Sequence, residues 1–218
     1  MCYHVTQTKM KIEAEKRFDA EVDPKVNFAP QNHYNGFDFP AMPIITDQNP
    51  LIITHFNWGL IPHWATDNEI RKSTLNAKIE TVTEKPSFRD IVNQRCLIIA
   101  DGYLEWKWLD AKGKNKQKYS IFEPDHGLFA FAGLYSITQN AETGKEQKTF
   151  TMLTTEANEL MSEIHNSKKR MPIILKREDE QKWLKRDSLQ NYAFPYSVEL
   201  SAEAEKAANE GWTLFDSL

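Results

Sequence analysis

The chain begins Met1-Cys2-Tyr3-His4, with a cysteine directly after the initiator methionine. If Met1 is removed, Cys2 carries a free α-amine and a thiol on adjacent carbons, a 1,2-aminothiol that no interior cysteine offers. The ordinary pKa values are about 7.7–8.0 for the α-amine and about 8.5 for the thiol, so both groups are partly reactive at neutral pH. This pair could capture an aldehyde as a thiazolidine ring, or the thiol could attack an amide with the amine as its base. A cysteine can also occupy position two without a role.

Glu105 is a candidate general acid or base. It stands between Leu104 and Trp106 in the apolar stretch ADGYLEWKW at 100–108. A carboxyl group in apolar surroundings has a raised pKa, which suits proton transfer near pH 7. Side chains alternate between the two faces of a strand, so the pattern fits a glutamate that points into solvent equally well.

His165 is a second candidate for proton transfer. It ends a predicted helix, and the cations Lys168, Lys169 and Arg170 follow closely. An imidazole there could move protons, and the cations could bind phosphate. The ordinary alternative is a structural histidine beside a solvated cationic helix end.

Amide and aromatic side chains could help to bind a polar substrate. Asn76 precedes Lys78 by two residues in TLNAKIET, which pairs an amide with a cation. WGLIPHW at 58–64 contains two tryptophans, and an exposed indole ring could stack on a nucleic-acid base. We expect Trp58 to fill the core. For Trp64, both core packing and stacking on a base remain open.

Metal-site spacings such as CxxC or HExxH are absent from the sequence, so we expect neither a metal ion nor another cofactor. Cys2 and His4 alone would need further ligands. Cys96 opens the apolar run CLIIA, where a free cysteine is usually a small buried hydrophobic residue.

The elements that position these residues are mostly short strands. Apolar runs separated by polar turns predict strands at 51–60, 95–108, 117–123, 128–138, 148–156 and 171–175. Apolar residues four apart predict a helix within 8–22, on the face of Met10, Ala14, Phe18 and Val22. Further helices are expected at 84–94, 157–165 and 177–185, and the segment 27–50 is expected to form turns and extended chain.

Consecutive strands joined by turns are typical of antiparallel hairpins. We therefore expect an α+β fold, with a predominantly antiparallel, barrel-like β core and peripheral helices. The length of 218 residues fits a single domain over 1–218.

The formal charge of −4 gives no overall signature of nucleic-acid binding, so DNA contact would need a local basic patch. The apolar runs are far shorter than the ~20 residues of a membrane span. The N-terminal segment also lacks the apolar core of a secretory signal. We expect a cytoplasmic monomer.

Six segments in this order closely resemble the SOS response-associated peptidase (SRAP) family of abasic-site processing proteins. They are Met1-Cys2, NFAP at 27–30, WGLIPHW at 58–64, LNAKIET at 75–81, ADGYLEWK at 100–107 and IHNSKKRMPIIL at 164–175. The resemblance implies an SRAP-like fold and binding of single-stranded DNA that contains abasic sites. It also implies a covalent thiazolidine crosslink to the lesion after self-removal of Met1, and association with the nucleoid when DNA is bound.

The resemblance also implies a role for each matching residue. Cys2 would be the nucleophile that forms the crosslink, and Asn76 would hold the sugar. Glu105 would assist removal of Met1 and proton transfer at the Schiff base. His165 would protonate the sugar oxygen and help to reverse the crosslink. Trp64 would stack near the lesion, and Lys78 and Arg170 would contact phosphate.

Three features of the sequence depart from the family pattern. The familiar start is Cys-Gly-Arg, whereas Tyr3 and His4 follow Cys2 here, so His4 is the candidate phosphate contact in place of arginine. Lys78 stands where arginine is common, which keeps the charge but loses the two-pronged geometry. Four residues separate His165 from Arg170, where relatives often have one.

Two other functions use the same residues. An N-terminal cysteine amidohydrolase would act through the Cys2 thiol and would be indifferent to abasic DNA. A non-enzymatic single-strand binder would need only the cations and aromatic rings, and would retain Met1.

Overall fold

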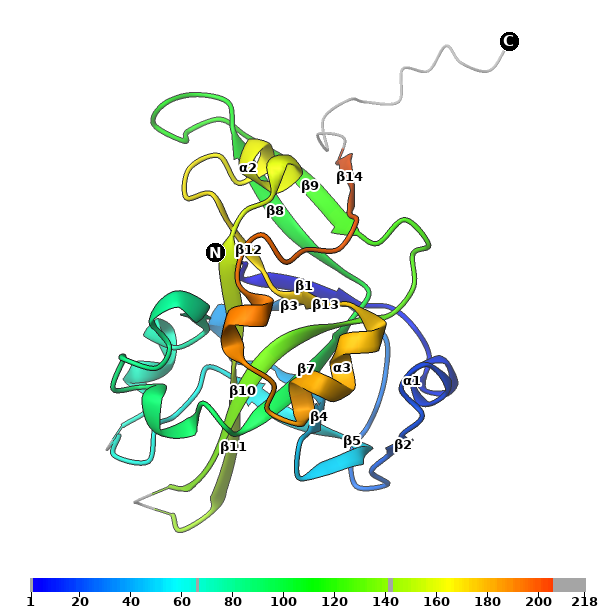
Figure 1. Cartoon of the computed structure of the whole chain (residues 1–218), viewed down its shortest axis with the longest axis vertical. Coiled ribbons are helices and arrows are strands. Elements are labelled where there is room, and N and C mark those ends of the chain that lie inside the picture. Colours follow the sequence, from blue (N-terminus) through cyan, green and yellow to red (C-terminus); the bar gives the residue numbers. More distant parts are fainter. Residues whose placement is uncertain (1, 66, 141–142, 206–218) are drawn as a thin grey trace, which may run out of the picture.

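The computed structural model describes residues 2–65, 67–140 and 143–205, so the expected removal of Met1 concerns a residue outside the described ones. Within these described ranges, two β-sheets and three short α-helices confirm the expected α+β fold (Figure 1). The strands are β1 His4–Gln7, β2 Glu21–Val22, β3 Gln31–Asn35, β4 Ala41–Thr46, β5 Asn49–Trp58, β6 Asn76–Lys78, β7 Arg95–Ala100, β8 Gly102–Trp108, β9 Lys116–Phe122, β10 Phe129–Gln139, β11 Glu146–Glu156, β12 Arg170–Pro172, β13 Ile174–Leu175 and β14 Ser201–Ala204. The helices are α1 Lys11–Phe18, α2 Glu159–Ile164 and α3 Arg177–Leu184, with 3₁₀ turns η1 Gly36–Asp38, η2 Glu69–Ser73, η3 Ile79–Thr81, η4 Arg89–Ile91 and η5 Leu189–Tyr192.

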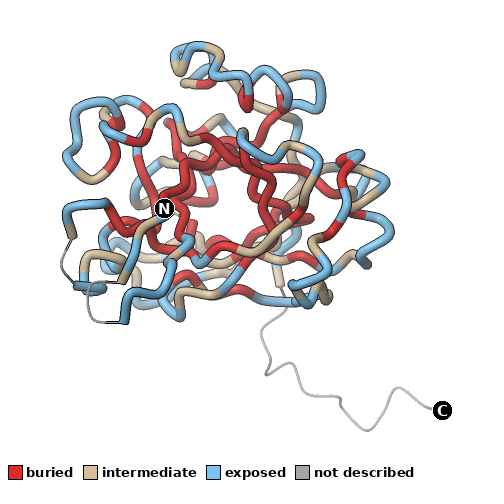
Figure 2. The backbone as a smooth tube through the Cα atoms, turned by 90° about the horizontal axis from the view of Figure 1, so that it is seen from below, coloured by how far each residue is buried: buried red, intermediate tan, exposed pale blue. Residues whose placement is uncertain are grey.

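Five strands close into a barrel in the order β11-β10-β7-β4-β5. Neighbouring strands are antiparallel except at the closure, where β11 and β5 run parallel with Phe150 opposite Trp58. Figure 2 shows the buried backbone as a closed ring, with exposed segments outside it. Closure pairs the strand edges that would otherwise be exposed, and it confirms the barrel-like core.

The second sheet is antiparallel throughout, in the order β14-β9-β8-β1-β3. It holds β1, which follows Cys2, beside β8, which carries Glu105. The turn before β8 fixes this pairing, because Asp101 accepts hydrogen bonds of 2.9 Å from the Thr6 hydroxyl and the Thr8 backbone N–H. Gly102 is required at the crossing, since a Cβ there would lie 2.8 Å from the Thr6 hydroxyl.

The barrel strands separate two apolar cores by side-chain alternation. On β7, Leu97 and Ile99 face a helix-side core that includes Trp183 of α3. Ile98 faces the other way, into a Cys2-side core that the barrel shares with the second sheet and that also contains Cys96. Each fully buried Leu or Ile contributes about 1.5–3 kcal/mol. The prediction that Cys96 is a buried hydrophobic residue is confirmed, and burial raises the pKa of its thiol.

Helix α1 is shorter than the periodic pattern predicted. Ala14 and Phe18 are buried as expected, but Met10 precedes the helix and is 58% exposed. Val22 lies on β2, because the helix ends at a left-handed Asp19. No helix in the described part of the chain is long and apolar enough to cross a membrane.

Two other element predictions were wrong in detail. The expected helix at 84–94 is a series of turns around the 3₁₀ turn η4, with only Phe88 and Ile91 buried as anchors. The run at 95–108 is two strands, β7 and β8, because the chain turns at Asp101. The first belongs to the barrel and the second to the other sheet.

Candidate active site around Cys2

Cys2 lies at the junction of the barrel and the second sheet, fully buried in the Cys2-side core. Its Sγ is 3.6 Å from the backbone oxygen of His4, to which the thiol donates a weak hydrogen bond. Burial, and then the nearby Glu105 carboxylate, raise the pKa of the thiol well above its usual range. The thiol is therefore protonated at neutral pH, and a nearby base is needed before it can act as a nucleophile.

Asn76 holds the backbone of Cys2. It starts β6, which pairs in parallel with β11 so that Asn76 lies opposite Met152. The Nδ2 atom donates a 2.8 Å hydrogen bond to the Cys2 carbonyl oxygen. The Oδ1 atom is buried and has no hydrogen-bond partner among the described residues. One end of the amide thus fixes Cys2, and the other end can accept a hydrogen bond from a substrate.

Glu105 lies inside the protein, which excludes the solvent-facing alternative. Its side chain is 5% exposed on β8, and its Oε1 atom has no hydrogen-bond partner within the described ranges. Burial raises the pKa of the carboxyl group to about 7, against smaller opposing effects of the positive charge of the N-terminus and then of the Trp106 backbone N–H. Both protonation states are therefore populated near neutral pH, as a general acid and base requires.

His165 caps the C-terminal end of α2. Its Nδ1 is 2.7 Å from the backbone oxygen of Arg170. Since a carbonyl oxygen only accepts, the neutral ring carries its proton on Nδ1, and Nε2 is the basic nitrogen. Burial lowers the pKa of His165, so the ring is mainly neutral at pH 7.

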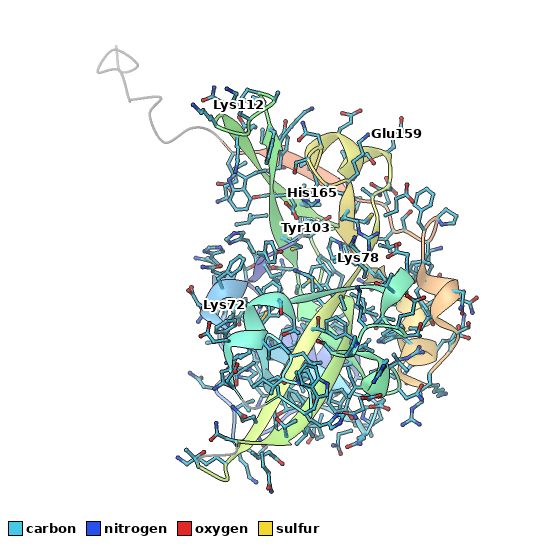
Figure 3. All side chains as sticks on the ribbon, turned by 90° about the vertical axis from the view of Figure 1, so that its left-hand side faces the viewer. Lys72, Lys78, Tyr103, Lys112, Glu159 and His165 are labelled. Carbon is cyan, nitrogen blue, oxygen red and sulfur yellow. The ribbon has the colours of Figure 1, made fainter. Side chains whose placement is uncertain are left out.

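The residue after His165 attaches this segment to the strand that carries Glu105. The Asn166 side chain accepts a 3.1 Å hydrogen bond from the Trp108 N–H and donates one of 2.9 Å to the Trp108 carbonyl. In Figure 3, His165 and Tyr103 of β8 lie in the same central region of the view. The sequence analysis did not identify Asn166, because a clamp between residues 58 positions apart leaves no local pattern.

Arg170 is engaged by a carboxylate. Its guanidinium group makes two parallel hydrogen bonds to Glu80, of 2.8 and 2.9 Å, and a third of 2.8 Å to the Thr154 backbone oxygen. Only 13% of the Arg170 side chain is exposed. The Arg170 guanidinium group, which was expected to bind phosphate, is thus already paired with the Glu80 carboxylate. Lys78, two residues after Asn76 on β6, is exposed. Nothing in the sequence pointed to Glu80.

His4 pairs with another histidine. Its Nδ1 lies 2.7 Å from Nε2 of His33, and its ring packs edge-on against Trp106. Burial, and then the positive charges of His33 and Lys118, lower the pKa of His4 to about 4. His4 is therefore uncharged at neutral pH and does not supply the positive charge of an arginine.

The two tryptophans of WGLIPHW differ in environment. Trp58 is fully buried, as predicted, and donates a 2.7 Å hydrogen bond to the Leu75 oxygen. Trp64 is 48% exposed, and its indole N–H donates to the Pro86 oxygen at 3.2 Å. A fixed, half-exposed ring of this kind is suited to stacking on a base.

Tyr103 is a further polar residue at this site that the sequence analysis missed. It is fully buried two residues before Glu105, and its hydroxyl has no hydrogen-bond partner in the described structure. Strand alternation could have indicated that Tyr103 and Glu105 share a face. No group of three or more potential metal ligands is found among the described residues.

Comparisons with known proteins identify chains that are similar to this one. The family model described as SOS response associated peptidase (SRAP) matches residues 1–207. Abasic site processing protein YoqW of Bacillus subtilis (strain 168) is 40% identical over 187 residues, which cover 83% of this chain and 78% of YoqW. Abasic site processing protein YoaM of the same strain is 39% identical over 185 residues, or 82% of this chain and 76% of YoaM. A crystal structure of a Bacteroides thetaiotaomicron protein is similar with a TM-score of 0.84 and 36% identity, over 94% of this chain and 92% of that one.

Proposed function

This chain belongs to the SOS response-associated peptidase family, and from that premise we propose that it processes abasic sites in single-stranded DNA through a covalent bond to Cys2. The observation that carries the proposal is the arrangement around Cys2. Asn76 donates a hydrogen bond to the Cys2 carbonyl group. The carboxyl group of Glu105 has a pKa of about 7, and its charge helps to raise the pKa of the Cys2 thiol. The relatives named abasic site processing proteins support the same substrate.

Removal of Met1 prepares the nucleophile. Hydrolysis of the Met1–Cys2 peptide bond consumes one water molecule, releases methionine and leaves the α-amine of Cys2 free. Glu105 can take a proton from the attacking group and return it to the leaving amine, because its carboxyl group titrates near pH 7. The product is the 1,2-aminothiol.

The abasic sugar supplies the electrophile. In its ring-opened form C1′ is an aldehyde. To open the ring, the basic Nε2 of neutral His165 can take the proton of the C1′ hydroxyl group and pass it to the ring oxygen as the bond between C1′ and that oxygen breaks. The α-amine of Cys2 then attacks C1′ and gives a carbinolamine, whose hydroxyl takes a proton and departs as water. The thiol finally passes its proton to Glu105 while sulfur bonds to the same carbon. Aldehyde and aminothiol thus give a thiazolidine and one water molecule, with no oxidant or reductant.

The DNA strand is held by surface groups around this centre. The Lys78 ammonium contacts phosphate, the half-exposed Trp64 ring stacks on a base, and His4 contributes a neutral hydrogen-bonding group. Arg170 contacts phosphate only after its ion pair with Glu80 opens. The Asn76 Oδ1 atom accepts a hydrogen bond from the sugar, since Nδ2 is committed to Cys2.

The direct test is intact mass and gel mobility after incubation with single-stranded DNA that carries one abasic site. Wild type should lose the mass of Met1 and form a heat-stable adduct of protein and DNA. Cys2→Ala should form none, whereas Cys96→Ala, which changes the other buried cysteine, should react like wild type. An adduct that persists in Cys2→Ala, or its absence in wild type, would contradict the proposal. Turnover of small amides without an adduct would favour an amidohydrolase.

A further inference from the structure

A buried hydroxyl group without a partner lies beside the proposed site. Tyr103 is 0% exposed, and its phenolic oxygen makes no hydrogen bond to any described residue. Burying a hydroxyl group without a hydrogen-bond partner destabilises the folded state, because the group loses its hydrogen bonds to water. An unsatisfied polar atom in the interior therefore calls for a specific explanation.

The packing around Tyr103 does not explain the hydroxyl. The ring contacts Phe131 edge-on, with 5.9 Å between the ring centres, and its β8 position lies opposite Val5 and Ile121 in the second sheet. These neighbours are apolar and would pack equally well against phenylalanine. The hydroxyl group therefore makes no hydrogen bond that stabilises the described structure, and we look for its partner in a bound ligand.

The hydroxyl lies among the groups proposed to react. Tyr103 and Glu105 are two residues apart on β8, so their side chains leave the same face of the strand. Burial, then the charges of Cys2 and Glu105, raise the pKa of the Tyr103 phenol well above its usual value. The phenol consequently keeps its proton at neutral pH and can act as a donor.

Three buried polar atoms around Cys2 lack partners in the described structure. They are Oδ1 of Asn76, the hydroxyl of Tyr103 and Oε1 of Glu105. Asn76 donates a hydrogen bond to Cys2 directly, and the charge of Glu105 helps to raise the pKa of both Cys2 and Tyr103. A small ligand with several oxygen atoms, such as a sugar, offers the kinds of hydrogen-bonding groups that these three atoms lack.

We propose that Tyr103 is a catalytic residue whose hydroxyl donates a hydrogen bond to the oxygen on C1′ of the abasic sugar. This inference rests on the proposed function. The bond stabilises the carbinolamine that forms when the Cys2 amine attacks C1′. That oxygen then takes a proton from the protonated carboxyl group of Glu105, the C1′–O bond breaks and water leaves. Tyr103 keeps its own proton throughout.

The experiment compares wild type with Tyr103→Phe in two assays. At saturating abasic single-stranded DNA, the rate constant of adduct formation should fall about 3- to 10-fold, as for loss of one neutral hydrogen bond. Binding to DNA with a tetrahydrofuran analogue, which lacks the oxygen on C1′, should stay within about two-fold, because the lost contact needs that oxygen. The midpoint of urea unfolding should be equal or higher, because no protein hydrogen bond is lost.

Tyr135→Phe is the matched control. Tyr135 is also buried, but its hydroxyl donates a 2.9 Å hydrogen bond to Asp47. This variant should react at the wild-type rate and unfold at a lower urea concentration. Loss of the hydroxyl group should thus slow the reaction without lowering stability at Tyr103, and lower stability without slowing the reaction at Tyr135.

Each other outcome is decisive. A Tyr103→Phe rate equal to wild type, an equal loss of affinity for the tetrahydrofuran DNA, or a lower unfolding midpoint would overturn the role of Tyr103 and leave the proposed function standing. No adduct with wild-type protein would overturn both.

Discussion

The side-chain amide of Asn76 donates a 2.8 Å hydrogen bond to the backbone carbonyl of Cys2, across 74 positions of sequence. This bond joins the residue after the initiator methionine to β6, which the barrel strand β11 holds in place. The orientation of the proposed nucleophile is therefore set by the barrel.

Replacing Asn76 with alanine should impair both stability and reaction. The change leaves the buried Cys2 carbonyl without its donor, which costs about 1–3 kcal/mol in the free energy of unfolding. The rate of adduct formation should fall at least about ten-fold, because the Cys2 backbone is no longer fixed. Urea unfolding and a gel assay on abasic DNA measure the two effects.

Asn57→Ala is the control for Asn76→Ala. Asn57 also donates to a backbone oxygen, that of Phe39 at 3.1 Å, but at an exposed position. This variant should react at the wild-type rate. Equal rates for both variants would contradict the positioning role of Asn76.

Glu105→Gln should make stability less dependent on pH. The folded protein raises the pKa of Glu105 from 4.5 to about 7, so the folded state binds this proton more tightly than the unfolded state. Stability therefore falls as pH rises through that window, and the cost is absent below it and complete above it. At about 1.4 kcal/mol per pKa unit, Glu105→Gln should gain roughly 3 kcal/mol over wild type above pH 7 and almost nothing near pH 4.

Urea unfolding at several pH values measures the gain of Glu105→Gln. The same substitution at exposed Glu84 should show no comparable gain. A constant difference between Glu105→Gln and wild type across the window would contradict the raised pKa.

Glu80→Gln should strengthen DNA binding. The neutral amide releases the Arg170 guanidinium, which two hydrogen bonds to the Glu80 carboxylate now occupy. We expect the dissociation constant for single-stranded DNA to fall by about three- to ten-fold, as for one gained contact of about 1 kcal/mol. Fluorescence anisotropy measures this, with Glu84→Gln as a control that removes the same charge nearby. Unchanged affinity in Glu80→Gln would indicate that Arg170 stays away from phosphate.

Trp64→Ala should weaken DNA binding without unfolding the protein. The ring is 48% exposed, so its loss removes little core packing. Loss of one base stack should cost about 1–3 kcal/mol of binding free energy. Ile137→Ala, at another exposed apolar position, should bind DNA normally. Anisotropy and thermal unfolding distinguish these outcomes, and normal binding by Trp64→Ala would exclude the stacking role.

His4→Arg should increase the salt dependence of DNA binding. His4 has a lowered pKa of about 4 and is neutral at pH 7, whereas arginine adds a full charge beside Cys2. One added phosphate contact should steepen the slope of log affinity against log salt by about 0.7 for a single strand. His126→Arg places the same charge at an exposed site elsewhere on the surface and should leave the slope near that of wild type. A slope unchanged in His4→Arg would place position 4 away from the DNA backbone.

Local patterns predicted most of the elements. Alternating apolar runs identified the strands around Glu105 and in β9, β10 and β11, and the helix before His165 was also correct. The errors arose where long-range contacts override local preference. Asp101 turns the run at 95–108 because hydrogen bonds from Thr6 and Thr8 hold it there. The segment at 84–94 is anchored by two side chains only, which is too few to stabilise an amphipathic helix.

The sequence by itself determined which chemical groups this protein has: a cysteine after Met1, an amide, a carboxyl group and an imidazole in the order of its family. The tertiary structure decided their state. Burial of Glu105 brings its pKa to about 7, burial and then the neighbouring His33 lower the pKa of His4 and leave it uncharged, and Glu80 engages Arg170. The structure also leaves the buried hydroxyl of Tyr103, on the same face of β8 as Glu105, without a hydrogen-bond partner among the described residues. Sequence lacks these facts because pKa and hydrogen bonding depend on neighbours that only folding brings within a few ångströms.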